Sequence, residues 1–136
     1  MVEAVGPRIS QWYVAFRDVK KTRWWQKFLK PGFRHSFAFT YDAACNRWLF
    51  FDPGWDGISL LGMHPLDFHK KLVKIYRTHT ILLCDTGKDV IFFPRLVMTC
   101  TTEIAHLLGF STMAWTPWRL FCALRKRGAK ISFVAE

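Results

Sequence analysis

Residues 33–51, FRHSFAFTYDAACNRWLFF, contain the pattern that decides the fold. Aromatic and apolar residues recur through 33–41 and again through 47–51, and both runs are rich in residues that favour β-strands. The segment DAACN between them contains an aspartate and an asparagine, which are common turn residues. We therefore expect two antiparallel strands joined as a hairpin.

Further strands are expected on both sides of this hairpin. Residues 9–17 predict a strand before it and residues 58–63 a strand after it, so the first half of the chain forms an antiparallel meander. Short β-like runs follow at 80–84 and 90–93 around the turn DTGKD, and 130–136 predict a terminal strand.

Three segments have the spacing of helices. Residues 66–77 follow a proline that suits a first helical turn, 100–108 end at a glycine, and 117–127 end at another glycine. The apolar side of the first helix is expected to consist of Leu66, Leu72, Val73 and Tyr76. Strands and helices together predict an α+β fold.

Size and composition favour one folded domain over residues 1–136. Apolar residues make up 51% of the chain, including 13 Phe and 7 Trp, which excludes a disordered protein. A chain of 136 residues can bury one core without disulfides or structural metals. The four cysteines have no CxxC pattern, so we expect free thiols.

The chain is strongly basic, with 20 Lys and Arg against 10 Asp and Glu. Such a charge favours anionic partners without identifying one. Residues 20–30, KKTRWWQKFLK, interleave basic and aromatic residues as single-strand nucleic-acid binders do, and a solvated loop with docked aromatics explains them equally. The candidate contacts to nucleic acid or another anion are Lys20, Lys21, Arg23, Lys27 and Lys30.

Targeting signals are not expected. The first ten residues contain an early acidic residue and no apolar core, which argues against a secretory signal and favours synthesis in the cytosol. The longest apolar stretch, 107–124, is interrupted by Gly109, Pro117 and Arg119, so we expect no membrane span.

Cys100 is the first candidate for chemistry. Thr99 is a suitable N-cap, which would place Cys100 at the first helical position, where free N–H groups and the helix dipole favour a thiolate. Glu103, one turn along, opposes that effect. The alternative is a small buried apolar residue, which is the commoner role of a free cysteine.

His35 and Asp52 are the candidates that would complete a site. A nucleophilic thiol needs a base within hydrogen-bond reach and a third group that orients the base. His35 lies in a predicted strand, where alternation puts it on the same face as Phe33, Phe37 and Phe39, either as a core histidine or as a shielded base. Asp52 ends the adjoining strand and is placed to orient His35 across the hairpin.

No metal or cofactor is expected. Glu103 and His106 are three residues apart on one predicted helix, but the second matching helix of a carboxylate-bridged iron site is absent from the sequence. His64 and His69 are five apart and would diverge on a helix.

Four segments carry a resemblance to a known family. PGFRHSFAF (31–39), RWLFFDP (47–53), TCTTEIAHLLGF (99–110) and TPWRLFCALRKRG (116–128) together resemble the papain-like NlpC/P60 superfamily in its permuted form, and more narrowly short bacteriophage and prophage proteins. The resemblance covers about residues 31–128. It implies an antiparallel sheet with packed helices and the cysteine at a helix N-terminus.

The resemblance also implies roles for the candidate residues. Cys100 would be the nucleophile, His35 the general base and Asp52 the orienting residue of a thiol hydrolase or acyltransferase. The substrate would be a peptide, a peptidoglycan-like molecule or another acyl compound. Common peptidoglycan endopeptidases have the cysteine before the histidine and are secreted, whereas this chain has the reverse order and no signal, so peptidoglycan is only weakly implied.

Two further functions stay open at this level. A phage structural or assembly protein, associated with the virion in a host bacterium, could use the same fold to bind other structural proteins, with its tryptophans as interface anchors. A basic nucleic-acid-binding protein is the other. An accessible thiol of low pKa beside His35 would favour the enzyme over both.

Overall fold

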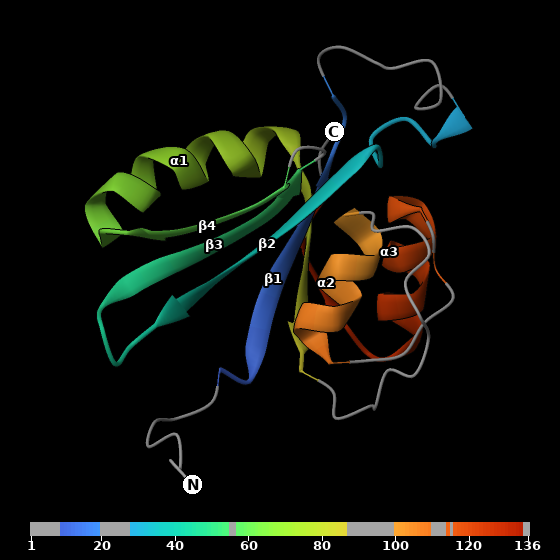
Figure 1. The fold of residues 1–136 in the computed structure, drawn as a ribbon. Coiled ribbons are helices and arrows are strands. Elements are labelled where there is room, and N and C mark those ends of the chain that lie inside the picture. Colours follow the sequence, from blue (N-terminus) through green and yellow to red (C-terminus); the bar gives the residue numbers. More distant parts are fainter. Residues whose placement is uncertain are drawn as a thin grey trace, which may run out of the picture.

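The computed structural model describes residues 9–19, 28–54, 57–86, 100–109, 114 and 116–134. Within these ranges the chain is α+β, with an antiparallel sheet of six strands in the order β4-β3-β2-β1-β5-β6 (Figure 1). The strands are β1 (Gln11–Arg17), β2 (His35–Asp42), β3 (Arg47–Gly54), β4 (Gly57–Met63), β5 (Thr80–Asp85) and β6 (Lys130–Phe133).

The predicted hairpin forms the neighbouring strands β2 and β3. Phe39 pairs with Phe50 across β2 and β3, and the turn between them ends at Asn46, whose φ of 51° is the left-handed conformation that asparagine tolerates. Strands β1 to β4 follow one another as neighbours, which confirms the predicted meander. β5 then pairs with β1, so the second half of the chain extends the sheet from its other side.

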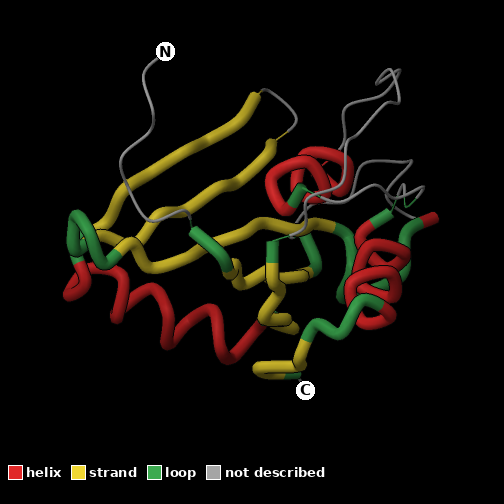
Figure 2. Tube along the Cα trace, turned by 90° about the horizontal axis from the view of Figure 1, so that it is seen from below, coloured by secondary structure: helices red, strands yellow, loops and turns green. Residues whose placement is uncertain are grey.

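The helices of the described ranges lie on opposite faces of the sheet. α1 (Pro65–Thr78) covers one face, and α2 (Cys100–Leu108) and α3 (Pro117–Lys126) cover the other (Figures 1 and 2). Two buried clusters result, because alternate residues of each strand point to alternate faces. The α1 side contains Ala15, Phe37, Phe39, Phe50, Phe68, Ile75 and Ile81, and the other side includes Val14, Phe16, Ala38, Leu82, Ile104, Leu108 and Leu120.

The predicted apolar side of α1 is partly wrong. Phe68 and Ile75 are the buried residues of this helix, with Leu72 and Tyr76 packed beside them, whereas Leu66 and Val73 are exposed. Phe68 and Ile75 are seven residues, or two turns, apart and so lie on one line along the helix. The phenyl ring of Phe68 stacks on Trp48 of the sheet, and this contact sets which side of the helix faces inward.

The expected surroundings of His35 also need a correction. Phe37 and Phe39 point to the α1 face as predicted, but Phe33 packs on the other side against Phe16, Trp118 and Phe121. Strand β2 begins only at His35, and the turn before it contains Gly32 with φ of +83°. The alternation of a strand therefore does not extend back to Phe33.

Some expectations fall outside the described residues. These are the strand at 90–93, the N-cap Thr99, and Lys20, Lys21, Arg23 and Lys27 of the basic segment. None of the helices in the described ranges is both long and apolar enough to cross a membrane.

Candidate functional site

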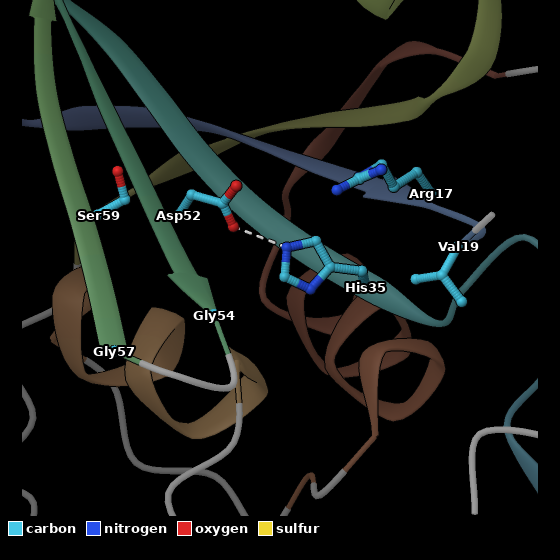
Figure 3. Close-up of a pocket in the computed structure, with 7 residues that line it drawn as sticks. All are labelled: Arg17, Val19, His35, Asp52, Gly54, Gly57 and Ser59. Atoms are coloured by element: carbon cyan, nitrogen blue, oxygen red, sulfur yellow. Dashed lines mark hydrogen bonds and ion pairs between the residues drawn. The ribbon is translucent and has the colours of Figure 1, made fainter. Parts of the chain in front are cut away.

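The start of β2 and the end of β3 bring His35 and Asp52 together. His35 is two residues before Phe37 and Asp52 is two residues after Phe50, so both side chains point to the same face of the sheet as these phenylalanines. His35 Nε2 lies 2.7 Å from Asp52 Oδ1, and Figure 3 shows the two side chains directed toward each other from neighbouring strands. The predicted His–Asp pair is therefore present.

The thiol of Cys100 is the second partner of His35. Burial alone would lower the pKa of His35, but hydrogen bonds to Asp52 and to Cys100, together with the charges of both groups, raise it to about 9. Because Nε2 faces Asp52, the remaining ring nitrogen, Nδ1, is the one left for the thiol. At neutral pH the imidazole is protonated and donates an N–H on each side.

The pKa of Cys100 shifts in the opposite direction to that of His35. Burial opposes ionisation of the half-buried thiol, but hydrogen bonds from His35 and Ser36 and the positive charge of His35 lower its pKa below the ordinary value of 9.0. Burial likewise disfavours the ionised form of Asp52. The hydrogen bond and charge of His35 and the nearby charges of Arg17 and Lys71 outweigh burial and lower the pKa of this carboxyl group. At neutral pH the site thus holds an imidazolium between a carboxylate and a thiol whose ionisation the imidazolium favours.

Ser36 belongs to this site, and the sequence analysis missed it. Its side chain is fully buried, and its hydroxyl has no partner of ordinary hydrogen-bond geometry within the described part of the chain. Both the hydroxyl and the backbone N–H of Ser36 nevertheless interact with Cys100 and lower the pKa of the thiol. Pairing between β2 and β3 starts only at Ala38, so Ser36 lies beyond the paired part of these strands.

No single signal in the sequence identifies Ser36, although its place beside the candidate base was visible. Consecutive residues of a strand point to opposite faces, yet His35 and Ser36 both contact the same thiol. Cys100 therefore lies beside the beginning of β2, where it can be reached from both sides of the strand. Only the packing of α2 against the sheet brings it there.

A pocket of about 310 Å³ opens beside the His–Asp pair. Figure 3 shows Arg17 of β1 on one side of His35 and Ser59 of β4 on the far side of Asp52. The remaining lining residues are Val19, Gly54 and Gly57. The pocket is open to solvent, so a molecule can approach these residues from outside.

The other cysteines differ from Cys100. Cys84 is buried in the core, and burial raises its pKa to about 12. Cys45 is exposed in the β2–β3 turn, and a hydrogen bond to Asp42 raises its pKa. Of these three thiols, Cys100 is the one whose pKa is lowered.

The remaining candidates do not join the site. Within the described ranges no group of three or more His, Cys, Asp or Glu side chains is arranged to hold a metal ion. His64 caps α1 by accepting a hydrogen bond from the Leu66 N–H. Lys30, the described member of the basic segment, lies over the ring of Trp118 at 3.4 Å from its centroid, which is a cation–π contact.

Comparison with known proteins gives no further guidance, because no protein-family model, curated protein or solved structure matches this chain. The chemistry of the site therefore has to be argued from its own geometry.

Proposed function

We propose that the protein is a cysteine hydrolase or acyltransferase that acts on an amide or ester bond through Cys100, His35 and Asp52. One observation carries this proposal: the His35 ring contacts both Asp52 and Cys100, which raises the pKa of the imidazole and lowers that of the thiol. A thiolate held beside an oriented imidazolium is the arrangement that nucleophilic cysteine catalysis requires.

The reaction follows from these protonation states. The Cys100 thiolate attacks the carbonyl carbon, and the carbonyl π electrons move to oxygen to form a tetrahedral oxyanion. His35 gives its proton to the leaving amine or alcohol as the carbon–nitrogen or carbon–oxygen bond breaks, which leaves a thioester on Cys100. Neutral His35 then removes a proton from water or an acceptor, which attacks the thioester and releases the thiolate.

Asp52 has an orienting role in this scheme. Its carboxylate oxygen Oδ1 accepts a hydrogen bond from the Nε2–H of His35 at 2.7 Å, which fixes the ring with Nδ1 toward the sulfur. The same negative charge stabilises the imidazolium, so the ion pair with Cys100 persists at neutral pH.

The proposal includes a papain-like arrangement in which Cys100 begins its helix. Cys100 is the first described residue of α2, and the free N–H groups of a helix start would stabilise both the thiolate and the oxyanion. The His-before-Cys order along the chain corresponds to the permuted form of that superfamily.

A pre-steady-state assay with p-nitrophenyl acetate tests this function. The wild-type protein is expected to release a burst of about one p-nitrophenolate per chain, because the first acetyl transfer to the thiolate is faster than hydrolysis of the thioester. Cys100→Ala is expected to lose the burst, and mass spectrometry should find acetyl on Cys100 in the wild type.

The matched control is Cys45→Ala, which removes an exposed thiol outside the site. It should retain the full burst. A burst of equal size in Cys100→Ala, or acetylation confined to other residues, would refute the proposed function.

A further inference from the structure

Strand β4 is an unusually unprotected edge of the sheet. It is the outermost strand, and β3 is its one partner among the described residues. Three large apolar side chains stand out from it: Ile58 is 53% exposed, Leu60 66% and Leu61 47%. Its sequence, GISLLGM, contains neither a charge nor a proline. Natural proteins normally protect such edges, because the unpaired backbone N–H and C=O groups of an edge strand can pair with another chain.

The opposite edge of the sheet shows the usual protection. β6 has only 4 residues, begins with Lys130 and is irregular where it pairs with β5. Short length, a lysine and an irregular register are standard ways to prevent edge pairing. Although Ile131 of β6 is also 46% exposed, β4 is the longer, regular and uncharged edge, so it is the edge better suited to pairing with another chain.

The position of β4 indicates which partner this is. Gly57 and Ser59 of β4 line the same pocket as His35 and Asp52, so the edge strand continues directly into the candidate active site. Gly54 and Gly57 face each other at the ends of β3 and β4, and neither has a side chain to obstruct the pocket. A Cβ on Gly54 would lie 3.3 Å from the Gly57 carbonyl oxygen, and Gly57 has φ of +147°, so larger residues are disfavoured at both positions.

We propose that β4 binds an extended, uncharged segment of a polypeptide substrate as a seventh strand and directs the following residues into the pocket. The part of the proposal that concerns peptide binding depends only on the edge strand. The part that concerns delivery of the peptide to Cys100 rests on the proposed function. Main-chain hydrogen bonds to the edge would supply affinity, as in other cases of β-strand addition.

The dimensions of a sheet allow this path. Neighbouring strands are about 4.8 Å apart, so a strand added outside β4 lies three spacings, or roughly 14 Å, from β2. An extended chain advances about 3.3 Å per residue, so roughly four residues reach from the end of the added strand to the start of β2. A substrate of about eight residues can therefore pair with β4 and still reach the start of β2, where His35 lies.

The register of β4 also defines the side chains that fit. Ser59 and Leu61 are opposite Asp52 and Phe50 and share their face, whereas Ile58 and Leu60 are on the other face. Residues of the added strand lie beside these side chains on both faces. We therefore expect apolar or small uncharged residues at successive positions of the bound segment.

The test uses the peptide acetyl-Thr-Val-Thr-Val-Thr-Val-Thr-amide and ¹⁵N-labelled Cys100→Ala protein, which cannot acylate. Amide shifts are expected to change along Ser59–Met63 and not along α1. The same peptide with N-methylated valines keeps its side chains but loses backbone donors, and it should produce no shifts.

A pair of variants locates the binding edge. Leu60→Lys places a charge on the edge strand and is expected to raise the Kd at least tenfold. Leu66→Lys makes the same change at an equally exposed leucine (72%) on α1 and should leave the Kd within twofold. Circular dichroism of both variants verifies that the fold is retained.

The outcomes separate this inference from the proposed function. Shifts at β4 in Cys100→Ala, together with a wild-type Cys100 that reacts no faster with iodoacetamide than an ordinary thiol, would uphold the peptide site and reject the enzyme. A fast Cys100 without shifts at β4 would reject the peptide site alone. A wild-type dimer that Leu60→Lys dissociates in sedimentation experiments would assign the edge to a second copy of this chain and overturn the proposal.

Discussion

Two histidines and two cysteines of the chain differ in how their environments shift their pKa values. At the start of β2, the pKa of His35 is raised to about 9 and that of Cys100 is lowered. Along β5 and the residue before it, the pKa of His79 is lowered to about 4 and that of Cys84 is raised to about 12. His35 is therefore protonated at neutral pH and its charge favours the thiolate of Cys100, whereas His79 and Cys84 are uncharged.

The difference lies in the neighbours and not in the depth of burial alone. Burial of His79 against Phe37 and the positive charges of Arg17 and His35 lower its pKa. These effects outweigh the interaction of its Nδ1 with the Ile75 carbonyl oxygen at 3.1 Å, which raises the pKa. Burial also opposes the charge on His35, but the carboxylate and thiolate beside it outweigh that cost. The presence of a histidine and a cysteine is therefore not enough to form an activated site. The charges that surround them determine which of these residues are activated.

The largest expected effect is that of His35→Ala on the reactivity of Cys100. Without the imidazolium, the half-buried thiol returns to an ordinary or higher pKa, and at pH 6 a thiol of pKa about 9 is only about 0.1% thiolate. The rate of Cys100 alkylation by iodoacetamide at pH 6 should fall about a hundredfold. Peptide mapping by mass spectrometry measures each cysteine separately.

Cys84 provides the internal control for this experiment. Its raised pKa predicts slow alkylation in the wild type and in His35→Ala alike. Equal Cys100 rates in the two proteins would show that His35 does not activate the thiol.

The second expected effect is that His79 makes the free energy of unfolding depend on pH. Between pH 6.5 and about 4 the unfolded chain binds a proton at His79 and the folded chain does not, so the free energy of unfolding decreases as the pH falls through this window. From pH 7 to pH 5 this loss amounts to roughly 2 kcal/mol. His35 has the opposite sign: its contribution is present below pH 6.5 and is lost as the pH rises through about 9.

Urea unfolding of the wild type and His79→Gln at pH 7 and pH 5 measures this effect. The variant has no imidazole to titrate, so its loss of stability between the two pH values should be smaller by roughly 2 kcal/mol. The comparison uses the change with pH and is therefore independent of any uniform cost of the substitution. An identical loss in both proteins would show that His79 is readily protonated in the folded state.

The smallest expected effect is that of Ser36→Ala. Removing the interaction of its hydroxyl with the thiolate, which contributes roughly 1.5 kcal/mol, should move the pH profile of Cys100 alkylation upward and slow the reaction about tenfold on its acidic limb. Thr101→Val is the matched control, because the Thr101 hydroxyl is also buried without a partner in the described ranges but has no part in the pKa of Cys100.

Thr101→Val should leave the alkylation profile unchanged. If both variants shift the profile equally, the effect arises from packing around α2 and not from a hydrogen bond of Ser36.

The sequence was informative where local pattern and burial agree. Alternation identified β1 to β5, and the glycines after α2 and α3 have the positive φ expected at a helix end, 67° at Gly109 and 93° at Gly128. It failed on the buried side of α1, because Leu66 and Val73 are as apolar as the residues that are buried. A helix with apolar residues on several sides can be turned in more than one way, and only contact with the sheet selects one.

The three candidate residues were proposed together, but only part of their arrangement follows from local pattern. The sequence by itself determined the residue types, the strands of His35 and Asp52 and their common face, because strand alternation and a short hairpin are local properties. Tertiary structure decided that Cys100, 65 residues beyond His35, meets the imidazole and Ser36 at the open end of the sheet. It also decided the protonation states, because a pKa depends on charges that only the folded chain brings together.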